Sequence, residues 1–125
     1  MHLIDTNIFL ELLLDQEKAV NCRRFLNKNS GSIHLSDFTL HSIGVILMRQ
    51  KKAEIFLRFV ADVLPNSIVF SLPHSRYKNI VGVSNSMKLD FDDAYQYLIA
   101  LEFNLTIVTL DSDFKRVKDV KVEFL

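Results

Sequence analysis

The chain has 125 residues, of which 49% are hydrophobic, and its formal net charge is zero; this length predicts a single domain, residues 1–125, with a core of its own. The neutral balance excludes a global positive field that would attract nucleic acid, so local patches would have to hold such a ligand. The single Cys22 excludes an internal disulfide and a cysteine-based zinc cluster, and we expect it to be a buried thiol.

Strand-like and helix-like stretches alternate along the chain. In order, the pattern predicts a strand over 2–5, helices over 8–14 and 17–28, a strand over 32–35, helices over 37–50 and 53–64, a strand over 67–72, helices over 75–87 and 91–103, and strands over 105–110 and 120–125. Ser36 and Asp90 are of the type that caps a helix start. Asn29-Ser30-Gly31 is expected to end the second helix through a left-handed residue, with Val20 among that helix's inner positions.

This alternation predicts an α/β fold with a parallel sheet covered by helices on both faces. Because crossovers between parallel strands are almost always right-handed, the carboxyl ends of the first and fourth strands should lie on one rim. If those strands are neighbours, Asp5 and Asp111 come close together. Open α/β sheets bind their ligands outside these strand ends.

The predicted helix over 37–50 is apolar on nearly every side. Such a helix is buried in its own chain or against a partner, and we expect a homodimer. The longest uncharged apolar stretch, 38–48, is too short to span a bilayer, which needs ~20 residues. The start of the chain lacks a basic region, and Asp5 interrupts its apolar run, so we expect a cytoplasmic protein without membrane contact.

Three acidic sites, at Asp5, at Asp93 and at Asp111, are expected on the same rim. Carboxylates packed together repel, and a divalent cation is the usual compensation. Oxygen ligands suit Mg²⁺ or Mn²⁺, and such an ion can lower the pKa of its water and orient a phosphate. The pattern therefore favours phosphodiester hydrolysis, and no Ser-His-Asp, Cys-His or Gly-rich phosphate motif competes with it.

Plainer interpretations stay open for these residues. Asp90 and Asp92 fit the role of acids that the helix dipole favours in a first turn. Asp111 and Asp113 could be ordinary turn formers, and Thr109 a β-branched strand residue. The basic side chains that could touch phosphates are Arg76, Lys78, Lys88, Lys115 and Arg116. The aromatic residues, mostly Phe, are expected in the core and not on a base-stacking surface.

Three segments carry a more specific signal: Leu3-Ile4-Asp5-Thr6-Asn7, Leu89-Asp90-Phe91-Asp92-Asp93-Ala94, and Val108-Thr109-Leu110-Asp111-Ser112-Asp113-Phe114. Each is weak alone, but in this order they resemble the PIN-domain family of ribonucleases, which includes the VapC-type toxins of toxin–antitoxin pairs. The resemblance spans essentially the whole chain. It implies a three-layer α/β/α sandwich around a five-stranded parallel sheet, Mg²⁺ or Mn²⁺, an RNA substrate and an antitoxin partner.

Carried over residue by residue, the resemblance makes Asp5, Asp93 and Asp111 the catalytic metal ligands. Asp113 would be a further acid acting through water. Asn7 and Thr109 would support the ligands by hydrogen bonds.

One position departs from the family pattern, which usually has a Glu on the helix after the second strand. The matching residue is Ser42, which supplies no negative charge, so metal binding should weaken. Asp37 and His41 share a face of this helix, but His41 could replace the Glu only if the helix were rotated.

Two other functions therefore remain as alternatives. The first is a PIN-like module that binds RNA or protein after losing catalysis. The second, which the sequence disfavours, is a receiver-like domain with an acidic phosphorylation pocket, because Lys115 is its only and poor candidate for the required lysine.

Overall fold

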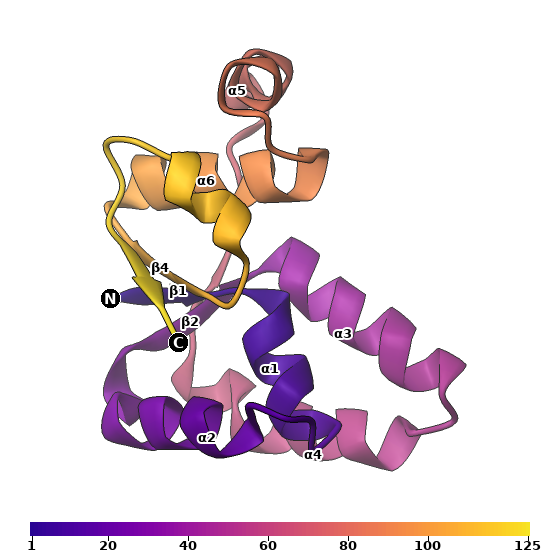
Figure 1. Cartoon of the computed structure of the whole chain (residues 1–125). Coiled ribbons are helices and arrows are strands. Elements are labelled where there is room, and N and C mark those ends of the chain that lie inside the picture. Colours follow the sequence, from indigo (N-terminus) through magenta and orange to yellow (C-terminus); the bar gives the residue numbers. More distant parts are fainter.

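The computed structural model describes all residues, Met1 to Leu125, as five strands and six α-helices (Figure 1). The strands are β1 (His2–Ile4), β2 (Ile33–Ser36), β3 (Val69–Phe70), β4 (Thr106–Thr109) and β5 (Val122–Phe124). The helices are α1 (Thr6–Leu13), α2 (Ala19–Lys28), α3 (Asp37–Arg49), α4 (Ala53–Asp62), α5 (Asn79–Met87) and α6 (Phe91–Phe103). Four 3₁₀ turns lie at Ser30–Ser32, Leu64–Asn66, His74–Arg76 and Ser112–Arg116.

All five strands are parallel, in the order β3-β2-β1-β4-β5. The first strand therefore lies at the centre, where Leu3 is opposite His34 of β2 and Ile107 of β4. The predicted five-stranded parallel sheet is confirmed, and β5 is an edge strand as expected. Because β1 and β4 are direct neighbours, the chain segments that follow them meet at one rim of the sheet.

Helices cover both faces of the sheet, which gives three layers (Figure 1). Successive strand side chains point to opposite faces. Leu3 and Ile107 pack on the face covered by α6, with α5 beyond it. Ile4 and Val108 pack on the other face, against α1, α3 and the neighbouring helices. The three-layer α/β/α sandwich expected from the sequence is confirmed.

Helix α2 departs from the prediction in two ways. Val20 is 62% exposed, and the buried positions of this helix are Ala19 and Cys22, so the thiol is buried as expected. The helix ends without a left-handed residue, since Asn29 has φ −115°. The Asn29 side-chain amide instead donates to the Phe25 carbonyl at 2.9 Å and satisfies the open helix end. Left-handed C-caps occur elsewhere, at Lys88 and Asn104.

Other predicted boundaries differ as well. The third strand is reduced to Val69–Phe70, and the segment predicted as one helix over 75–87 is a 3₁₀ turn followed by α5. Helix α3 matches its predicted range to one residue, and the Ser36 hydroxyl caps it by accepting from the Thr39 N–H at 3.0 Å. None of the six helices has the length and apolar character that crossing a bilayer requires.

Candidate active site

The carboxyl ends of β1 and β4 form one wall of the candidate site, here called the strand side. Asp5 directly follows β1 and is only 8% exposed. Its carboxylate accepts a hydrogen bond from the Thr109 hydroxyl at 2.7 Å and one from the Thr6 N–H at 2.8 Å. These two donors fix the orientation of the Asp5 carboxylate.

The same hydrogen-bond chain continues through the turn after β4. The Thr109 hydroxyl accepts from the Asp111 N–H at 2.9 Å, and the Asp111 carboxylate accepts from the Asp113 N–H at 2.9 Å. The Asn7 side chain accepts from the Leu110 N–H at 3.4 Å, so Asn7 holds the main chain of this turn and not a carboxylate. One buried hydroxyl thus positions both Asp5 and Asp111.

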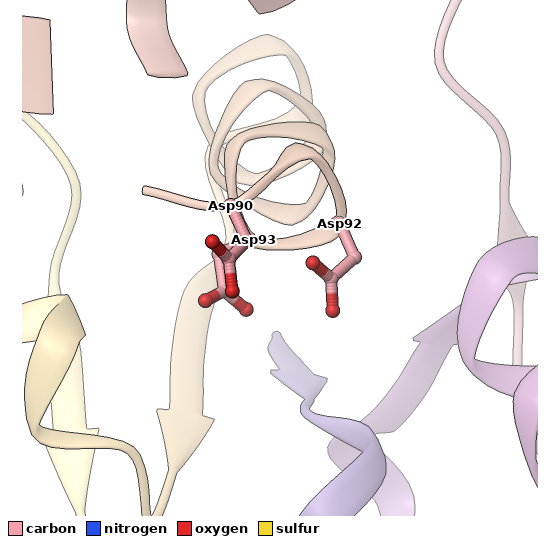
Figure 2. Close-up of side chains that lie close together, drawn as sticks. All are labelled: Asp90, Asp92 and Asp93. Carbon is pink, nitrogen blue, oxygen red and sulfur yellow. The ribbon is translucent and has the colours of Figure 1, made fainter. Parts of the chain in front are cut away.

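The first turn of α6 forms the opposite wall, the helix side (Figure 2). Figure 2 shows Asp90, Asp92 and Asp93 pointing to the same side of the turn, and their carboxylate oxygens lie within 4.8 Å of one another. Carboxylate oxygens of Asp93, Asp111 and Asp113 also lie within 4.8 Å of one another. Asp93 belongs to both groups and is therefore the point at which the helix side meets the strand side. Asp5 belongs to neither group at this distance.

A hollow of about 320 Å³ lies between the two sides. Its lining includes five aspartates, namely Asp5, Asp90, Asp92, Asp93 and Asp111. Ser42, on α3, lines the same hollow, whereas His41 faces a different one. The geometry thus places the predicted trio in one hollow and Ser42 at its wall, and it gives no support to His41 as a replacement for the family's Glu.

The hollow is strongly acidic. Burial, and then the charges of Asp92, Asp5, Asp111 and Asp90, raise the pKa of Asp93 to about 7. Burial also raises the pKa of Asp5, although the hydrogen bonds from Thr109 and Thr6 oppose the shift. No lysine or arginine lines the hollow. Its carboxylates therefore need a proton or a bound cation for compensation.

Side-chain hydrogen bonds next to the hollow join helices α1, α3 and α6. The Thr39 hydroxyl lies 3.0 Å from that of Thr6 and accepts from the Gln96 amide at 2.8 Å. The side-chain oxygen of Gln96, Oε1, is buried and has no hydrogen-bond partner. We did not single out Thr39 or Gln96 from the sequence, although Gln96 follows Asp93 by three residues and so shares its helix face.

Two of the predicted phosphate-binding cations have other partners. The Arg76 guanidinium pairs with Glu102 at 2.8 Å. The Arg116 guanidinium pairs with Asp113 at 3.1 Å and donates to the Lys88 carbonyl at 2.6 Å. Arg116 therefore links the turn after β4 to the segment that leads into α6.

The fold recurs in solved structures with low sequence identity. VapBC2 from Rickettsia felis bound to a DNA fragment from its promoter has a TM-score of 0.79 at 18% identity, covering 98% of this chain and 97% of that one. A toxin–antitoxin complex from Klebsiella pneumoniae has a TM-score of 0.77 at 21% sequence identity, and the match covers 96% of this chain and 95% of that one. FitAcB from Neisseria gonorrhoeae has a TM-score of 0.78 at 24% sequence identity, and the match covers 100% of this chain and 97% of that one. At these identities the likeness bears on the fold alone.

A sequence comparison identifies the family. No match was found among curated proteins. The sequence model of the PIN domain, by contrast, matches residues 2–120, which is nearly the whole chain and includes all three acidic segments. PIN domains are a family of nucleases, so the match supports a nuclease. The chain belongs to the PIN-domain family.

Proposed function

We propose that this protein is a metal-dependent endoribonuclease whose ligands are Asp5, Asp93 and Asp111. The observation that carries the proposal is that these three carboxylates, from three separate segments, line one hollow that contains no cationic side chain. A site of this kind is suited to a phosphodiester only when a cation offsets the repulsion between carboxylates and phosphate.

The donor set fits Mg²⁺ or Mn²⁺. All the acidic groups present hard oxygen atoms, which these ions prefer. The pKa of Asp93, raised to about 7, means that this group is about half protonated at neutral pH when no cation is bound, and a cation would displace the proton. When bound, such an ion supplies a water of lowered pKa and neutralises charge on the phosphate.

The protein's own groups would set the geometry of the reaction. Thr109 and Thr6 hold the Asp5 carboxylate in one orientation. Asp113 accepts from Arg116, which leaves it at the edge of the cluster and suits a contact through water. Ser42 lines the hollow from α3 but supplies no negative charge to it.

The decisive test is cleavage of a panel of structured RNAs with Mg²⁺ or Mn²⁺. We expect cleavage by the wild type and a loss of at least about a hundredfold in Asp5→Asn and in Asp93→Asn, since each removes a ligand charge. Asp119→Asn is the matched control, because Asp119 is exposed and its φ of 67° is one that Asn tolerates. Cleavage that survives in both ligand variants would overturn the proposal.

The same proposal includes a role as the toxin of a toxin–antitoxin pair. The similar structures named VapBC2 and the Klebsiella pneumoniae complex support it. A groove of about 540 Å³ between α1, α2 and α4, mostly apolar but edged by Arg23, Arg58 and Asp62, is suited to a partner segment. Expression of the protein should arrest growth unless Asp93 is replaced, and co-expression of a protein encoded beside it should relieve the arrest.

We also propose a homodimer formed through the middle helices. Val45 and Met48 on α3 and Leu57 on α4 are 49%, 60% and 65% exposed, and these two helices pack against each other, so a second copy could cover the apolar surface that they share. Light scattering should give a dimer for the wild type and a monomer for Met48→Glu. Val20→Glu, at an exposed position of α2, should remain a dimer; a monomeric wild type would contradict the proposal.

The second candidate function is a binding module that has lost catalysis. Ser42 favours it, because the hollow lacks the acid that the family usually provides at this position. Titration with Mn²⁺ separates the two functions. A nuclease should bind Mn²⁺ in a manner that Asp5→Asn and Asp93→Asn weaken, whereas the binding module need not bind it.

A further inference from the structure

A second hollow, of about 220 Å³, lies next to the acidic one and is lined mainly by aromatic rings. Its lining residues come from three segments: Asp37, Phe38 and His41 from the start of α3, Phe91 and Tyr95 from the start of α6, and Tyr77 from the turn before α5. Phe38 lines both hollows. We call this second hollow the aromatic pocket.

The inner wall of the aromatic pocket is held rigidly. The buried Tyr95 donates its hydroxyl to Asp37 at 2.7 Å and accepts from the Leu72 N–H at 3.1 Å. The ring centroid of Tyr95 lies 6.4 Å from that of Phe38 and 5.8 Å from that of Tyr77. The pocket is therefore formed before any ligand arrives.

The outer wall is exposed although it is aromatic. Phe91 is 58% exposed and Tyr77 is 44% exposed, so the expectation that the aromatic residues serve only the core is wrong here. Phe91 directly precedes Asp92 and Asp93 in the chain, and it lines the aromatic pocket, which shares Phe38 with the acidic hollow. Exposed rings next to a phosphate-handling site are typical stacking platforms for bases.

The polar groups of the aromatic pocket restrict what can enter it. Asp37 already accepts from the Phe38 N–H, the Tyr95 hydroxyl and the Ser71 hydroxyl. A carboxylate offers about four acceptor positions, which leaves one, on Oδ2. A guanidinium, which needs two parallel acceptors, is poorly matched. A phosphate would meet the Asp37 carboxylate, and His41 is the one lining side chain that can carry a positive charge. A flat ring that presents one N–H from its edge is well matched.

We propose that the aromatic pocket binds one base of the RNA, that of a nucleotide next to the phosphodiester held at the acidic hollow. The inference rests on the proposed function of that hollow, and it assigns the base-recognition step to residues outside the carboxylate cluster. Phe91 and Tyr77 stack on the base, and the free position of Asp37 accepts from its N–H. Loss of one stacking ring should weaken base binding roughly five- to a hundredfold.

The test is an NMR titration of the intact protein with the four nucleoside 5′-monophosphates, without metal and with ribose 5-phosphate as the base-free probe. We expect the ring signals of Tyr77 and Phe91 to shift with at least one nucleotide and not with ribose 5-phosphate. Phe91→Leu and Tyr77→Leu should each weaken the binding. Phe103→Leu is the control, because Phe103 lies on the same helix about 18 Å along its axis from Phe91.

Several outcomes would overturn the inference. They are equal shifts with ribose 5-phosphate, no shift with any nucleotide, or binding that Phe91→Leu and Tyr77→Leu leave unchanged. Shifts that appear only with N-acetyl-arginine amide would assign the pocket to a protein partner instead. Asp93→Asn separates this inference from the nuclease proposal, since it should abolish cleavage and leave the nucleotide-induced shifts at Tyr77 in place. In a cleaving protein, Phe91→Leu should raise KM more than it lowers kcat.

Discussion

The two walls of the acidic hollow differ in what surrounds their buried carboxylates. On the strand side, burial raises the pKa of Asp5, but hydrogen bonds from Thr109 and Thr6 oppose the shift and fix the orientation of the carboxylate. On the helix side, Asp93 is equally buried, but burial and four neighbouring carboxylates raise its pKa to about 7. The strand side is therefore organised by the protein itself, whereas the charge of the helix side depends on what binds there.

The largest effect should follow from breaking the strand side. Thr109→Val keeps the shape of the side chain but removes the donor to Asp5 and the acceptor for the Asp111 N–H. We expect cleavage to fall about 10- to 100-fold and the free energy of unfolding to fall by about 1–3 kcal/mol. Thr106→Val, at the half-buried other end of β4, is the control for the loss of a hydroxyl. Unchanged cleavage in Thr109→Val would show that Asp5 needs no such support.

The next largest effect should be a pH dependence of stability that comes from Asp93 on the helix side. The pKa of Asp93 is about 7 in the folded protein, against a usual value of 3.8, so the folded state holds the proton more tightly than the unfolded chain. This contribution to stability is present below about pH 4 and is lost as the pH rises through about 7. The Tm of the metal-free protein should therefore fall between about pH 4 and pH 7 and level off above that range. Asp93→Asn should flatten the slope, and Mn²⁺ should restore the Tm at the upper end.

A smaller effect should come from restoring an acid on α3. Ser42→Glu adds a carboxylate at the wall of the hollow, and we expect Mn²⁺ affinity to rise about tenfold, with cleavage rising in parallel. The same change should lower the Tm of the metal-free protein, because it adds repulsion. Ser42→Gln has nearly the same size without the charge. Equal affinities in the two variants would mean that position 42 does not reach the cation.

The smallest effect should come from Arg116, which links the two sides at their edge. Arg116→Gln removes an exposed ion pair with Asp113 and a bond to the Lys88 carbonyl. The loss of stability should be less than about 1 kcal/mol, as for most exposed pairs. Mn²⁺ affinity should rise about twofold, since Asp113 loses its counter-charge. Chemical denaturation and Mn²⁺ titration measure the two effects, with Lys115→Gln as the neighbouring control.

Much of this architecture was predictable, because its signals are local. The alternation of strands and helices was enough to predict the parallel sheet, and the strand ends placed Asp5 and Asp111 on one rim. The Ser36 cap was visible as a residue type in the right place. The family resemblance matched Ser42 to the position of the usual Glu, and Ser42 does line the hollow.

The failures have physical causes that a single sequence does not display. The buried face of α2 depends on the direction in which the helix docks, so Val20 could not be told from Cys22 by spacing alone. The exposure of Phe91 and Tyr77 depends on three segments meeting around Tyr95, which is a tertiary event. The sequence also could not show that Asp5 lies outside both close carboxylate groups, because that separation depends on how the segments after β1 and β4 and the start of α6 are placed in space.

The central position of β1 also bears on the order of events during synthesis. Strand β1 pairs with strands on both sides, and the contact between Asp5 and Thr109 spans 104 positions of the chain. The middle of the sheet cannot close until β4 has left the ribosome, and contacts this distant in sequence are slow to form. Because Asp111 lies in the segment after β4, the acidic hollow cannot assemble on a nascent chain before that segment has been made.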